Sequence, residues 1–238
     1  MSDINFYFDP VCPFAWMTSK WVRRVQAQRD YEVDWRFISL RLLNSNIDYD
    51  THFPPEYGAG HNAGLRMLRM AAAARDAHGR DAMSALQQSF GDHIFEVAQS
   101  DAPDRHHMGT PEHVTPILQQ SGLPTDLTEA LYDESWDTTI QSETDEALAL
   151  TGKDVGTPII HFEPPEGVAF FGPVISRMPA DDQALELWEH VIGLARFPSF
   201  TEMKRSLREL PQLPALGVAE EEAGQTEDWH QGSRRQKK

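Results

Sequence analysis

Residues 4–16 read INFYFDPVCPFAW, and they contain the strongest structural signal of the chain. Within residues 4–8, apolar residues at every second position and a high aromatic content are typical of a β-strand. A short Asp-Pro-Val segment follows, then Cys12, and then Pro13, which suits the first position of a helix. The stretch therefore predicts a strand that passes directly into a helix, with Cys12 at the junction.

The flanking sequence extends this junction into a strand–helix–strand unit. The helix is predicted from Phe14 to about Arg29, and a second strand from Tyr31 to Leu40, where apolar residues alternate again. Three such elements within about 40 residues are typical of a parallel βαβ unit. The next segment contains no convincing strand and instead predicts helices at residues 61–78, 82–98, 111–120, 127–133 and 136–151.

Strands return after this helical block. Residues 158–162 and 168–171 predict an antiparallel hairpin, and residues 182–195 predict a closing helix. Residues 200–210 predict one further short helix. The order βαβ, helical block, ββα predicts an α/β protein with the thioredoxin fold and a large all-helical insertion.

The same pattern predicts one domain, because both halves of the sheet must come together around the insertion. We expect the domain to cover residues 1–210, with a core at about 3–42 and 153–198 and an insert at about 58–152. From residue 211 onward Pro, Gly, Glu and Gln dominate, so we expect residues 211–238 to form a disordered tail.

Composition excludes several classes of partner. Asp and Glu number 37 against 21 Lys and Arg, a net charge of −16, which argues against nucleic acid or an anionic membrane surface as a partner. No apolar run approaches the roughly 18 residues of a membrane span. The N-terminus lacks the pattern of a secretory signal, so we expect a cytoplasmic protein.

Cys12 is the only cysteine of the chain. An intrachain disulfide and a thiolate zinc cluster are therefore excluded. His106, His107 and His113 are irregularly spaced in a proline-flanked loop, so we expect no metal site.

Two local features could carry chemistry. A cysteine at a helix N-terminus reacts more readily as its thiolate, because backbone N–H groups and the helix dipole favour negative charge there. The alternative for Cys12 is a small buried apolar residue. Thr157-Pro158 directly precedes a strand, which is compatible with a cis peptide bond or with an ordinary trans proline that starts an edge strand.

The two features together indicate a family. The pairing of FDPVCPFAW at residues 8–16 with VGTPIIH at residues 155–161 resembles the DsbA-like thioredoxin-fold proteins, and most closely the actinobacterial mycothiol-dependent nitroreductase group. The resemblance covers about residues 3–210. It implies that Cys12 is an exposed nucleophilic thiol beside a cis-proline loop, and that substrate and thiol are bound by Pro13, Phe14, Ala15, Trp16, Asn44, Tyr57, Gly156, Thr157 and Pro158.

The sequence departs from this family at two positions. Ala15 stands where the second cysteine of the Cys-x-x-Cys motif belongs, and Phe95 stands where the nitroreductase group has a histidine. Without a second thiol, an external thiol must resolve a mixed disulfide at Cys12. This external thiol could belong to a low-molecular-weight thiol or to a small redoxin. The resemblance implies mycothiol or a similar small thiol as co-substrate, and we expect no tightly bound cofactor.

Three functions remain open at this point. The first is a monothiol oxidoreductase that acts on a disulfide or an electrophilic small molecule through Cys12. The second is a thiol-dependent isomerase or transferase of the hydroxychromene-carboxylate isomerase or kappa-class type, which shares the fold. The third is a ligand-binding relative in which Cys12 takes no part in redox chemistry.

Overall fold

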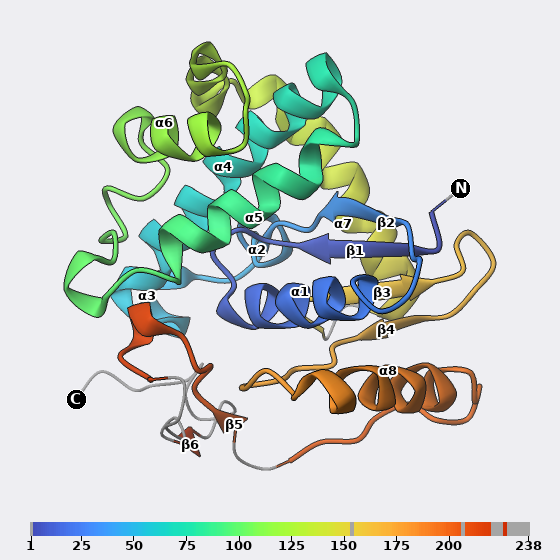
Figure 1. Cartoon of the computed structure of the whole chain (residues 1–238). Helices are drawn as coiled ribbons and strands as arrows, with labels where there is room; N and C mark the ends of the chain where they lie inside the picture. Colours follow the sequence, from blue (N-terminus) through green and yellow to red (C-terminus); the bar gives the residue numbers. More distant parts are fainter. Residues whose placement is uncertain (1, 153–154, 206–207, 220–225, 228–238) are drawn as a thin grey trace.

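The computed structural model describes residues 2–152, 155–205, 208–219 and 226–227 (Figure 1). Its main sheet has four strands in the order β2-β1-β3-β4. The central strand β1 runs parallel to β2 and antiparallel to β3, and β3 runs antiparallel to β4. These strands are β1 (Ile4–Phe8), β2 (Val33–Phe37), β3 (Ile159–Phe162) and β4 (Ala169–Phe171). The predicted α/β class with its parallel βαβ unit and antiparallel hairpin is confirmed.

Strand β1 is covered on both faces. All five of its side chains are buried, including Asn5 and Tyr7, which the alternating pattern would place on a solvent face. One face of the strand joins the large apolar core, while Tyr7 joins a second cluster with Ile159 of β3 and Ala147. The C-terminal end of β1 therefore delivers Cys12 into the interior of the molecule.

Two helices close the face of the sheet that carries the large core. They are α1 (Pro13–Gln26) and α8 (Asp181–Ala195). Trp21 of α1 and Trp188 of α8 are fully buried with ring centroids 5.1 Å apart, and the Trp21 indole N–H donates to the carbonyl of Ala184 at 2.9 Å. This contact holds α1, which begins next to Cys12, against α8.

The insertion between β2 and β3 is helical in the described residues, as predicted. Figure 1 shows its helices α4 to α6 on the opposite side of β1 from α8. The helices are α2 (Leu40–Leu43), α3 (Tyr49–His52), α4 (Pro55–His78), α5 (Ala82–Ile94), α6 (Pro111–Gln120) and α7 (Asp137–Thr151), with short 3-10 segments at Gln99–Asp101, Thr125–Tyr132 and Glu134–Trp136. None of the helices in the described part of the chain is long and apolar enough to cross a membrane.

The region after α8 differs from the prediction. The expected helix over 200–210 does not form in the described residues, which instead include a short strand at Arg208–Glu209 paired with Thr226–Glu227. Residues 211–219, predicted as part of the disordered tail, pack on the body of the protein and include a 3-10 turn at Pro214–Leu216. Leu213 in this segment is fully buried. The prediction was wrong here because a few apolar residues can anchor a segment whose overall composition is polar. The tail beyond them, except Thr226–Glu227, lies outside the described residues.

Candidate active site

Cys12 is the N-cap residue of α1. Its backbone is extended, the helix begins at Pro13, and the backbone N–H of Ala15 donates to the Cys12 sulfur at 3.4 Å. A donor of this kind stabilises a thiolate more than a neutral thiol, because the charged sulfur is the stronger acceptor. The strand, cysteine and helix are thus arranged as the sequence predicted.

The Thr157–Pro158 turn lies beside this sulfur. Its peptide bond is cis, and the Cys12 S–H donates to the carbonyl oxygen of Thr157, with 3.4 Å between sulfur and oxygen. The Thr157 hydroxyl donates to the carbonyl of Tyr7 at 3.3 Å, which ties the turn to β1. Two segments 145 residues apart in sequence therefore meet at one thiol.

The thiol is more covered than the resemblance implies. Only 8% of Cys12 is exposed, and the residue is part of the apolar core cluster. The aromatic side chains of Phe14 and Trp16 on α1 are buried as well. The thiol is therefore only slightly accessible to solvent in this structure.

Asp9 braces the loop that carries Cys12. One carboxylate oxygen accepts from the backbone N–H of Val11 at 3.0 Å, and the other accepts from the N–H of Leu40 at 2.8 Å. The residue is 1% exposed, and burial raises the pKa of its carboxyl to about 7 in spite of these two hydrogen bonds. The Asp-Pro-Val sequence is a turn signature, but the bond to Leu40 spans 31 residues and could not be predicted.

Gly64 lets the insertion come close to this carboxyl. A Cβ atom at Gly64 of α4 would lie 2.6 Å from the Asp9 carboxylate and 3.0 Å from the Val11 side chain. Glycine is therefore required here for α4 to pack on the Cys12 loop. The loop is held between the core sheet and the helical insertion.

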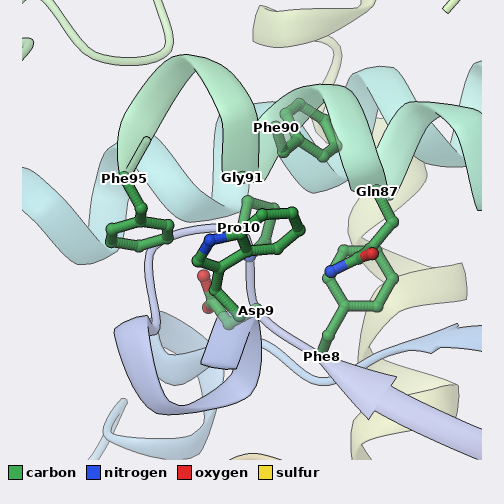
Figure 2. A pocket seen from close by; sticks show the side chains of 8 residues that line it. Phe8, Asp9, Pro10, Gln87, Phe90, Gly91 and Phe95 are labelled. Carbon is green, nitrogen blue, oxygen red and sulfur yellow. The ribbon is translucent and has the colours of Figure 1, made fainter. Parts of the chain in front are cut away.

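A small cavity lies beneath the loop. Its volume of about 10 Å³ is close to the least that holds one water molecule. Figure 2 shows Phe95, Pro10 and Asp9 together at one end of it. The residues that line the cavity are Phe8, Asp9, Pro10, Trp16, Gln87, Phe90, Gly91 and Phe95.

Phe95 occupies the position where the resemblance predicts a histidine. Its ring is buried and lines the same cavity as Asp9, so an apolar group borders the carboxyl in place of a polar one. On the same wall, a Cβ at Gly91 would lie 2.1 Å from the Trp16 ring, whose indole N–H donates to Glu96 at 2.7 Å. Next to the Trp16 ring, the side of the site formed by α5 is therefore tightly packed.

Asn44 and Tyr57, the two predicted pocket residues from the insertion, belong to one cluster. They are joined through Tyr49 and His61, which the sequence did not single out. The Tyr49 hydroxyl lies 2.9 Å from His61 Nδ1, and the rings of Tyr57 and His61 have centroids 5.6 Å apart. The Asn44 side-chain N–H donates to the carbonyl of Leu40 at 2.8 Å, next to the Leu40 N–H that binds Asp9.

The remaining predicted site residues lie in the two segments that meet at Cys12. Pro13 and Ala15 lie in the first turn of α1, and Gly156 precedes the Thr157–Pro158 turn. No group of three or more potential metal ligands occurs among the described residues.

The comparisons with known proteins concern the family and the fold of this chain. The chain is 28% identical over 218 residues to the uncharacterized protein Rv2286c of Mycobacterium tuberculosis, covering 90% of this chain and 84% of that protein. Its fold is similar to the crystal structure of the probable DsbA oxidoreductase SCO1869 from Streptomyces coelicolor, with a TM-score of 0.52, 13% identity, and coverage of 90% and 98% of the two chains. A family model described as mycothiol-dependent nitroreductase Rv2466c matches residues 11–205. The chain therefore belongs to the Rv2466c-like family of thioredoxin-fold proteins.

Proposed function

We propose that the protein is a monothiol oxidoreductase in which Cys12 is the nucleophile and an external low-molecular-weight thiol completes the cycle. The observation that carries this proposal is the position of the Cys12 sulfur, which lies 3.4 Å from the Ala15 N–H and 3.4 Å from the Thr157 carbonyl oxygen. Membership of a family described as mycothiol-dependent supports a thiol of that kind as the co-substrate.

The reaction has two steps. The Cys12 thiolate attacks one sulfur of a disulfide, forms a mixed disulfide and releases the other sulfur as a thiolate. The external thiol, as its thiolate, then attacks the substrate sulfur of the mixed disulfide, forms a new disulfide with it and releases Cys12 as a thiolate for the next cycle. Ala15 supplies no second thiol, so resolution within the chain cannot occur.

The neighbours of the Cys12 sulfur can stabilise both the neutral thiol and the thiolate. In the resting thiol, the S–H proton is bound by the Thr157 carbonyl. When this proton leaves, the Ala15 N–H and the N-terminus of α1 stabilise the negative sulfur. The small exposed fraction of Cys12, 8%, favours a small disulfide or a small electrophile as substrate.

The proposal is tested by alkylation of the reduced protein across a pH series. We expect the midpoint of the rate profile to lie below about 8.5, the ordinary pKa of a cysteine thiol. After incubation with a small disulfide, intact-mass measurement should show one thiol adduct in the wild type and none in Cys12→Ser. An ordinary midpoint together with no adduct would refute the proposal, and turnover of a hydroxychromene without disulfide exchange would favour the isomerase instead.

A further inference from the structure

Two arginines stand beside the aromatic cluster that adjoins the Cys12 loop. The Arg41 guanidinium lies over the Tyr49 ring, with 4.7 Å between its central carbon and the ring centroid. The Arg105 side chain runs along α4, where its Cδ would lie 3.3 Å from a Cβ at Gly60, next to His61. Both arginines are half-buried.

Neither arginine is neutralised by a neighbouring acid. Among the residues that the structure describes, no carboxylate oxygen lies within 4.0 Å of either guanidinium. The acids that flank them in sequence bind local backbone instead, since Asp48 accepts from Asp50 N–H and Asp104 accepts from two consecutive N–H groups. Asp9 is buried and binds Val11 and Leu40. Within the described part of this chain of net charge −16, Arg41 and Arg105 thus place two positive charges beside one aromatic cluster without an acidic partner.

The rest of the cluster is aromatic and uncharged. Burial lowers the pKa of His61 to about 4, with the Arg105 and Arg41 charges acting in the same direction, so the ring is neutral at pH 7. The rings of Phe53 and Tyr57 stack with centroids 5.6 Å apart and an interplanar angle of 8°, and both are half-buried. A flat ring system therefore borders two positive charges.

The cluster is connected to the reactive loop. Gly64 follows His61 by one turn of α4, and its backbone packs on Asp9 and on Val11, the residue before Cys12. A ligand that rests on the cluster would thus lie next to the loop that holds the thiol.

We propose that Arg41, Tyr49, Phe53, Tyr57, His61 and Arg105 form a subsite for a substrate that carries a carboxylate on an aromatic ring. The guanidiniums bind the carboxylate through charge-assisted hydrogen bonds, and the aromatic side chains pack against the ring. This inference rests on the proposed thiol function of Cys12 and names the class of its disulfide or electrophilic substrate.

The test compares two aromatic disulfides that differ in charge. One is 5,5′-dithiobis(2-nitrobenzoate), which carries a carboxylate on each ring, and the other is the neutral 2,2′-dithiodipyridine. In both reactions the Cys12 thiolate forms a mixed disulfide and releases one aryl thiolate, which is followed by absorbance. The readout is the ratio of the two second-order rates at low salt, for the wild type, Arg41→Gln/Arg105→Gln and the control Arg29→Gln. Arg29 is an exposed arginine beyond the far end of α1.

We expect the double variant to lower the ratio of anionic to neutral rate at least about fivefold, and the control to leave it unchanged. A ratio that stays the same, or falls equally in the control, would overturn the subsite. Arg41→Lys/Arg105→Lys retains both charges and should keep most of the ratio, which separates recognition from loss of structure.

Failure of the proposed function gives a different result. If the wild-type thiol reacts with neither disulfide faster than a free thiol, the function of Cys12 is refuted. The subsite is then tested by equilibrium binding of 2-nitrobenzoate to Cys12→Ser. Binding that disappears when Arg41→Gln and Arg105→Gln are added to this variant supports the subsite. Absence of binding to Cys12→Ser overturns it.

Discussion

Replacement of Asp9 by Asn should change how the stability of this protein depends on pH. Burial raises the pKa of the Asp9 carboxyl from 3.8 to about 7 in the folded protein. One pKa unit corresponds to about 1.4 kcal/mol, so the difference of about three units amounts to about 4 kcal/mol. Because the folded pKa is the higher one, this stability is fully present below pH 4 and is lost as the pH rises through 7.

Asp9→Asn removes the titrating carboxyl but retains the size and shape of the side chain. Its amide offers only one oxygen to the N–H groups of Val11 and Leu40, so its NH₂ group faces one of these donors and costs about 1–3 kcal/mol. We expect the wild type to be the more stable protein near pH 4. This advantage should shrink by up to about 4 kcal/mol by pH 8, because only the wild type then buries a charge.

Urea unfolding at a series of pH values between 4 and 8 measures the difference directly. The exposed Asp30, replaced by Asn, is the matched control, and its curve should parallel that of the wild type. If the difference between the wild type and Asp9→Asn is the same at all pH values, Asp9 does not titrate near neutrality, and the cavity beneath the Cys12 loop is not an apolar environment.

Three further predictions concern packing and chemistry. Gly91→Ala should destabilise the protein by about 1–3 kcal/mol, because the new Cβ would overlap the Trp16 ring, whereas Gly193→Ala on α8 meets no atom within 4 Å and should be neutral or stabilising in thermal unfolding. Ala15→Cys should form an internal disulfide after attack on an aromatic disulfide, so that a second aryl thiolate is released without added thiol; release of only one equivalent would contradict this. Leu213→Ala should cost about 2–5 kcal/mol in urea unfolding, while a disordered tail predicts no change.

The parts of the site that could be predicted from sequence are those with a local signature. Cys12 and Pro13 follow a strand directly, so the junction and its position at a helix N-terminus could be predicted without long-range information. The Thr157–Pro158 turn was associated with Cys12 only through the resemblance, because no local rule predicts a contact across 145 residues.

The parts that were missed depend on pairing between distant segments. Asp9 has the form of an ordinary turn residue, and its burial follows from its bond to Leu40 and from the close approach of Gly64. Tyr49 lies between the predicted strand that ends at Leu40 and the predicted helix that begins at His61. The two residues come together only because α3 packs on α4, which no local pattern predicts. Leu213 was predicted to lie in a disordered tail because the overall composition of that segment is polar. A few apolar residues nevertheless decide whether such a segment packs, and Leu213 is fully buried.

The absence of a side chain at position 64 has an evolutionary consequence. The Asp9 carboxylate and the Val11 side chain occupy the space that a methyl group at position 64 would need. A descendant that acquires a larger residue at 64 must shorten or lose the acid at 9, or let α4 move away from the loop. The two positions are thus expected to change together across relatives of this chain, although 55 places separate them in the sequence.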